Sequence, residues 1–274
     1  MRAVPALLTI VLLLGPPRLA GAAELPIFDT HVHYSHDAVS VVPPKEAIAI
    51  LRKAGLKRAL VSSSDDEGTQ KLLAEAPDLI VPELRPYRKR GELSTWMKDP
   101  DALRYVEDLL RKHKYVAIGE FHLYGADADL PISRRIVELA RQHGLFLHAH
   151  VDVDALERIF KQDPRARVLW AHSGFEPVDK VRELMRTYKT LWADLALRSE
   201  PGSSGGVSPE WREAFMEFPD RFMVGTDTWV PERWHYIPEQ AASSRAWLAD
   251  LPGEVAERIA WKNAETLFVT GARR

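Results

Sequence analysis

The sequence predicts a single α/β domain that folds as a (β/α)8 barrel, or TIM barrel. Eight short apolar runs alternate with amphipathic segments within about 250 residues, which is the usual length of this fold. Side chains of the types that bind metals end several of these runs. In a closed barrel such ends meet on one rim, whereas an open doubly wound sheet would spread them across its width. The pattern therefore favours a closed barrel.

The expected elements follow one another regularly along the chain. Apolar residues recur every three or four positions in the helices and form short continuous runs in the strands. Gly55 and Gly144 end two of the helices, and Pro131 lies in the first turn of another. Strands are expected at 28–33, 58–61, 79–84, 116–120, 145–150, 168–171, 191–195 and 222–225. Helices are expected at 44–54, 67–76, 101–113, 131–143, 154–162, 178–188 and 209–218, and from 239 to 268 with interruptions near Pro252 and Gly253.

Residues 1–22 are expected to form a secretory signal peptide. Arg2 precedes an apolar run at 3–14, and small residues provide an Ala-x-Ala cleavage site that ends at Ala22. The apolar run is shorter than the roughly 20 residues of a membrane-spanning helix. Residues 23–274 are then one barrel domain, expected to be secreted or periplasmic and free of the membrane after cleavage.

Composition limits the partners and the metal ligands that this protein can have. The chain is 46% hydrophobic and 28% charged, as is usual for a globular protein, and its formal net charge of -2 gives no electrostatic reason to bind nucleic acid. The sequence contains no cysteine, so disulfides and thiolate ligands are excluded. Any transition metal must be held by histidines and carboxylates.

Two histidines in the first expected strand form a candidate half-site for a metal. His31 and His33 stand two positions apart, so their side chains point to the same side of the strand and can share one ion. Further candidate ligands stand at the ends of four later strands: Glu120, His148, His150, His172 and Asp227. A barrel rim would bring all of them together.

Five motifs in this order resemble the amidohydrolase superfamily of metal-dependent hydrolases. They are Phe28-Asp29-Thr30-His31-Val32-His33, Ile118-Gly119-Glu120, Leu147-His148-Ala149-His150, Trp170-Ala171-His172-Ser173-Gly174 and Met223-Val224-Gly225-Thr226-Asp227. Residues 263–268 are similar to the closing helix of the branch that contains aminocarboxymuconate semialdehyde decarboxylase and related lactone hydrolases. The resemblance covers nearly the whole chain after the expected signal peptide.

The resemblance implies that His31 and His33 bind a divalent metal, most naturally Zn²⁺, as the chemistry of neutral imidazole ligands also indicates. The ligand from the fifth strand is either His150 or His148, because both point the same way. The register of the family favours His150, which leaves His148 as a neighbour of the ligands or a substrate contact.

Two further residues receive roles from the same resemblance. Asp227 resembles the strand-eight aspartate that binds metal and acts as general base toward the attacking water, whose pKa zinc lowers to about 7. His172 resembles the strand-six histidine, which either binds a second metal or hydrogen-bonds the substrate or the nucleophilic water.

Glu120 departs from several branches of the superfamily. Many members with two metals carry a carboxylated lysine on strand four, where this chain has Gly119-Glu120. That pair is similar to the TatD-like deoxyribonuclease branch, in which the glutamate binds metal. Glu120 is therefore expected either to bridge two ions or to stand beside a single ion as a neighbour of the ligands or a substrate contact.

Residues that follow the strands are candidates for substrate binding. Arg85 could pair with a substrate carboxylate or phosphate, although such arginines are more often solvated surface groups. His122 could contact substrate from the end of strand four, but a surface histidine is the more usual case. Trp229 could form an aromatic wall or simply pack against the C-terminal helix. The expected partner is a small molecule, and whether the protein forms a homo-oligomer stays open.

These features predict a metal-dependent hydrolase that cleaves a C–N, C–O ester or lactone bond of a small organic substrate. The alternatives are a metal-dependent decarboxylase on the same site and a TatD-like phosphodiesterase, which the near-neutral charge disfavours for nucleic acid. A binding protein without catalysis would be expected to lack some ligands, and every expected position is filled.

Overall fold

The structure, a computed structural model, describes residues 24–202 and 206–271. The expected signal peptide at 1–22 lies outside these residues and stays a prediction. Within the described part of the chain, no helix combines the length and the apolar character needed to cross a membrane.

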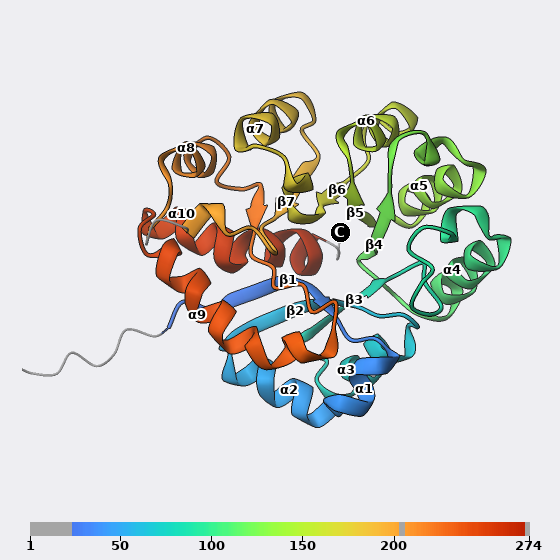
Figure 1. Cartoon of the computed structure of the whole chain (residues 1–274), viewed down its shortest axis with the longest axis horizontal. Coiled ribbons are helices and arrows are strands. Elements are labelled where there is room, and N and C mark those ends of the chain that lie inside the picture. Colours follow the sequence, from blue (N-terminus) through green and yellow to red (C-terminus); the bar gives the residue numbers. More distant parts are fainter. Residues whose placement is uncertain (1–23, 203–205, 272–274) are drawn as a thin grey trace, which may run out of the picture.

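Eight parallel strands form one sheet in sequence order, which confirms the predicted barrel (Figure 1). The strands are β1 (Ile27–His33), β2 (Leu56–Ser62), β3 (Ile80–Leu84), β4 (Ala117–Leu123), β5 (Phe146–Val151), β6 (Val168–Trp170), β7 (Leu191–Asp194) and β8 (Phe222–Met223). The seam between β8 and β1 is closed by Thr30, whose backbone N–H and hydroxyl both donate to the carbonyl of Val224 at 2.9 Å.

Helices cover the outside of the barrel between the strands (Figure 1). They are α1 (His36–Val41), α2 (Pro44–Lys53), α3 (Glu67–Glu75), α4 (Pro100–Lys112), α5 (Pro131–His143), α6 (Val153–Gln162), α7 (Val178–Thr187), α8 (Pro209–Glu217), α9 (Ile237–Leu248) and α10 (Gly253–Glu257). Short helices η1 (Trp96–Lys98), η2 (Gly125–Asp129), η3 (Ala171–Phe175), η4 (Glu200–Gly202) and η5 (Pro231–Tyr236) lie in the connections, and π-helical turns η6 (Arg258–Lys262) and η7 (Glu265–Thr270) end the described chain.

The elements differ from the sequence predictions at a few places. Helix α1 has only six residues, too few for a helical repeat of apolar positions, and was not predicted. Strand β8 is shorter than the predicted strand at 222–225, because the chain leaves β7 after Met223 and turns toward β1. The predicted interruption near Pro252 separates α9 from α10.

An apolar layer fills the end of the barrel at which the strands begin, and the last helical segment, η7, covers this end. Phe268 in η7 is buried, and its ring lies 6.2 Å from the ring of Phe28 and 4.9 Å from that of Phe146. The layer is completed by Leu60, Val81, Ala117, Leu169, Met223 and Ala264. Because this end of the barrel is filled with apolar side chains, the polar side chains inside the barrel lie at the opposite end, where the strands have their carboxyl termini.

Replacing Phe268 with Ala is expected to lower the free energy of unfolding by about 3–5 kcal/mol, because it leaves a cavity between the last helix and the barrel. Urea denaturation followed by circular dichroism measures this change. The matched control is Met216→Ala on the exposed surface of α8, where a change within about 0.5 kcal/mol is expected. Equal effects of the two substitutions would contradict the role of Phe268.

Candidate metal centre

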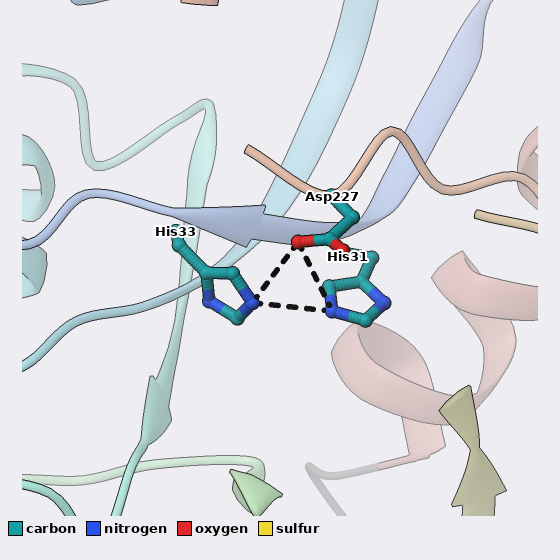
Figure 2. Close-up of side chains that lie close together, drawn as sticks. All are labelled: His31, His33 and Asp227. Atoms are coloured by element: carbon teal, nitrogen blue, oxygen red, sulfur yellow. Dashed lines mark hydrogen bonds and ion pairs between the residues drawn. The ribbon is translucent and has the colours of Figure 1, made fainter. Parts of the chain in front are cut away.

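Strand β1 places His31 and His33 side by side on the inner side of the barrel rim, and both are buried. Their Nε2 atoms lie 3.2 Å apart. The carboxylate of Asp227, which follows β8, faces the same point, with Oδ1 3.4 Å from Nε2 of His33 and 3.8 Å from Nε2 of His31 (Figure 2). The three side chains form a triangle of donor atoms.

The loop after β8 is attached to β1, and this attachment positions Asp227. The backbone N–H of Asp227 donates to the carbonyl of His31 at 2.7 Å. The buried carboxylate of Asp29 accepts hydrogen bonds from the N–H of Thr226 at 3.0 Å and from its hydroxyl at 2.7 Å. Gly225 permits this approach, because a Cβ atom there would lie only 2.8 Å from Cβ of His31.

The triangle fits a divalent metal ion. Ligand atoms about 2.0–2.1 Å from a tetrahedral zinc ion lie about 3.3 Å from one another, close to the separations observed among His31, His33 and Asp227. Oδ1 of Asp227 is buried and makes no hydrogen bond within the described chain. A buried carboxylate oxygen normally has a partner, and a cation would provide one.

Glu120 on β4 links this triangle to a second group of ligands. Its Oε2 lies 3.2 Å from Nε2 of His33, whereas Oε1 lies 2.8 Å from Nδ1 of His150 and 3.5 Å from Nε2 of His172. Nδ1 of His172 donates to the carbonyl of Ala196 at 2.9 Å, so in the neutral ring Nε2 carries the lone pair that faces the carboxylate. These residues can hold one ion or a pair bridged by Glu120.

His148 lies deeper in the barrel, outside the groups around Asp227 and Glu120 that could hold an ion. Its Nδ1 donates to Glu83 at 3.1 Å and its Nε2 to Asp194 at 3.0 Å. Burial opposes the charge, but Glu83 and Asp194 raise the pKa of His148 to about 9. Both of its ring nitrogens are thus engaged by carboxylates.

Asp194, at the end of β7, connects His148 to the triangle. Its Oδ2 also accepts from Nδ1 of His31 at 3.2 Å, which leaves Nε2 of a neutral His31 free to bind an ion. Neither Asp194 nor Glu83 was predicted as a site residue. The available signal was the same as for Glu120: a carboxylate near the carboxyl end of an expected strand.

The site carries an excess of buried negative charge. Burial works against ionisation of Glu120, yet the neighbouring imidazoles, chiefly that of His31, hold its pKa well below its usual range. Burial also lowers the pKa of His31, but Asp194, Asp227 and Glu120 together raise it well above its usual value. Three carboxylates around one imidazole favour a bound cation in their midst.

Arg85 supplies the positive charge next to Glu120. Its guanidinium donates to Oε2 of Glu120 at 2.9 Å and to the backbone carbonyl of Glu120 at 3.0 Å, and the side chain is almost fully buried. Arg85 also lines the cavity above the ligands. The residue predicted to pair with a substrate anion is therefore paired with a carboxylate of the protein.

A cavity of about 260 Å³ opens above the candidate ligands. Glu120, His150, His172 and Asp227 contribute to its polar floor, and the other two residues predicted to bind substrate, His122 and Trp229, also line it. Apolar wall is provided by Leu93, Leu197 and Trp229, each at least 40% exposed. The arrangement suits a small molecule with a polar reactive group and an apolar body.

Comparisons with known proteins agree with this architecture. The amidohydrolase family model matches residues 92–269, and no curated protein matches the chain in sequence. An uncharacterized TIM-barrel protein from Bordetella bronchiseptica has a TM-score of 0.66 at 14% identity, over 91% of this chain and all of that one.

Two candidate 2-pyrone-4,6-dicarboxylic acid hydrolases have a similar fold. The protein from Pseudomonas putida has a TM-score of 0.60 at 14% identity, over 91% of this chain and 99% of its own. The protein from Acinetobacter baumannii, solved with citric acid bound, has a TM-score of 0.58 at 13% identity, over 88% and 98% of the two chains. At sequence identities this low, the similarity establishes a shared fold and no more.

Replacing Asp194 with Asn is expected to weaken zinc binding about 10–100-fold, because the neutral amide accepts the Nδ1 proton of His31 less strongly than a carboxylate and can instead donate its own N–H to Nδ1. Competition titration with a chromogenic chelator measures the dissociation constant. Asp179→Asn, at an exposed carboxylate on α7, is the matched control and should leave it unchanged. Equal zinc affinity in the two variants would refute the role of Asp194.

Proposed function

The chain belongs to the amidohydrolase family, a family of metal-dependent hydrolases, and from this premise we propose that it hydrolyses a C–N, ester or lactone bond of a small organic substrate. The observation that carries the proposal is the triangle of His31, His33 and Asp227 beneath the cavity, with one buried carboxylate oxygen that makes no hydrogen bond to any residue the structure describes.

The residues that would hold the metal are His31, His33 and Asp227, with Glu120 and His150 adjoining them. The metal would be a divalent cation, and zinc suits the nitrogen and oxygen donors. When bound, such a cation supplies positive charge that lowers the pKa of water and polarises a substrate carbonyl.

Asp227 is the general base of the proposed reaction. Its Oδ1 faces Nε2 of both His31 and His33, whereas Oδ2 lies 3.9 Å from Nε2 of His172 at the floor of the cavity. Burial raises the pKa of Asp227, and a raised pKa makes the carboxylate a better proton acceptor. It takes a proton from the attacking water and returns that proton to the leaving group.

His172 orients the water in this proposal. Its N–H at Nδ1 is held by the carbonyl of Ala196, so Nε2 is available to accept a hydrogen bond. Since the acceptor is fixed before substrate enters, the water is ordered without a further change in the ring.

The cavity supports the proposed substrate class. A volume of about 260 Å³ limits the substrate to a small molecule, and the apolar wall at Leu93, Leu197 and Trp229 suits an uncharged body. The two structural neighbours from Pseudomonas and Acinetobacter are candidate hydrolases of a pyrone, a ring that contains a lactone bond. Lactones and aryl esters are therefore the first substrates to test.

Removal of metal with dipicolinic acid is expected to abolish hydrolysis of dihydrocoumarin and 4-nitrophenyl acetate and to lower the melting temperature, because the buried carboxylates then lose their counter-charge. Restoring zinc should recover both properties, and elemental analysis gives the number of ions per chain. Full activity in the metal-free protein would refute the proposal.

Asp227→Asn is expected to lower kcat/KM at least about 100-fold, because the amide cannot accept the proton of the attacking water. The control is again Asp179→Asn, which should keep full activity. Reactions run in ¹⁸O-labelled water should place the label in the product. Release of carbon dioxide without the label would instead identify a decarboxylase.

A further inference from the structure

His122 stands on β4 two residues after Glu120, so both side chains lie on the same side of the strand. Its ring is stacked on that of His150, with centroids 4.2 Å apart and planes inclined by 25°. The side chain lines the cavity next to the candidate ligands. His122 is thus in place to touch a substrate.

The position of His122 is fixed by two side chains behind it. The hydroxyl of Tyr87 accepts a hydrogen bond from the backbone N–H of His122 at 2.7 Å, and the indole of Trp96 donates to its carbonyl at 2.9 Å. Tyr87 is itself buried, with the guanidinium of Arg85 4.7 Å from its ring centre. Little freedom remains for this part of β4.

The hydrogen bonds of Tyr87 determine which nitrogen of His122 carries the proton. The Tyr87 oxygen already accepts the backbone N–H, so its single proton must be donated. Within the described chain, the acceptor it contacts is Nδ1 of His122 at 3.0 Å. A buried hydroxyl without an acceptor would destabilise the fold. Neutral His122 therefore accepts at Nδ1 and carries its proton on Nε2.

His122 presents a fixed N–H donor to this cavity; of the two guanidinium groups that line it, that of Arg90 donates to the carbonyl of Trp229 and pairs with Asp37. The carboxylates of Glu120 and Asp227 only accept, and His172 presents a lone pair at Nε2. Arg85 donates to Glu120. The Nε2–H group of His122 makes no hydrogen bond within the described residues, so it is free to donate to a ligand.

We propose that His122 is a further catalytic residue, which donates a hydrogen bond from Nε2 to the substrate oxygen that gains negative charge during bond cleavage. Tyr87 is the positioning residue that holds this tautomer. The inference rests on the proposed hydrolase function. No proton leaves His122: the proton of the attacking water passes through Asp227, and the His122 donor only stabilises the developing charge.

The first test is the tautomer itself, which is independent of activity. Long-range ¹⁵N–¹H NMR of histidine-labelled, zinc-loaded protein distinguishes protonated from unprotonated ring nitrogens, and comparison with His122→Phe assigns the signals. We expect Nε2 protonated and Nδ1 unprotonated. His122→Gln provides the same assignment if His122→Phe fails to fold, and a proton on Nδ1 would overturn the inference.

The second test compares two substitutions at His122. His122→Phe keeps an aromatic ring against His150 but removes the donor, and should lower kcat about 100–1,000-fold with little change in KM. His122→Gln retains an N–H donor at a similar reach and should keep kcat within about tenfold of the wild type. Tyr87→Phe, which frees the tautomer, should fall between them. Zinc content should be unchanged in all three, because His122 is not a ligand.

The outcomes separate this inference from the proposed function. Metal-dependent hydrolysis by the wild type with equal kcat in His122→Phe overturns the role of His122 alone. Loss of zinc from His122→Phe also overturns it, since the residue would then act through the metal. Absence of hydrolysis by the zinc-loaded wild type on esters, lactones and amides overturns the proposed function and the catalytic role together.

Discussion

The attachment of the loop after β8 to β1 is the constraint on which both the barrel and its site depend. Strand β8 has only two residues, so the seam is closed by a few bonds: Thr30 to Val224, Asp29 to Thr226, and the Asp227 N–H to His31. The same bonds bring Asp227 against the β1 histidines. The bonds that close the barrel therefore also assemble the candidate metal centre.

Three imidazoles at the rim, those of His31, His172 and His122, have their proton position determined by a partner on the far side of the ring. The carboxylate of Asp194 holds the proton of His31 on Nδ1, and the carbonyl of Ala196 does the same for His172. At His122 the partner is the hydroxyl of Tyr87, which donates to Nδ1, so the proton of the ring lies on Nε2 instead. Chemically similar rings thus present lone pairs at some points of the cavity and an N–H at another.

Stability and chemistry occupy opposite ends of the barrel. The amino-terminal end is an apolar layer closed by Phe268, whereas the carboxyl end concentrates buried carboxylates around His31. Such charges destabilise a fold unless they are paired. The apolar layer stabilises the fold, and Arg85 and His148 neutralise part of the buried negative charge. The rim can therefore keep an excess of carboxylates, which a bound cation would neutralise.

By itself the sequence determined the barrel, because local periodicity identifies strands and helices, and it determined that His31 and His33 share one side of a strand. Strand ends also indicated Glu120, His150, His172 and Asp227. Only the tertiary structure decided the partners of these residues. His148 and His150 have the same side-chain direction, but the register of β5 against β4 pairs His148 with Gly119 and His150 with His122. His148 therefore lies one pleat deeper, between Glu83 and Asp194 of distant strands, and such contacts between strands leave no local pattern in the sequence.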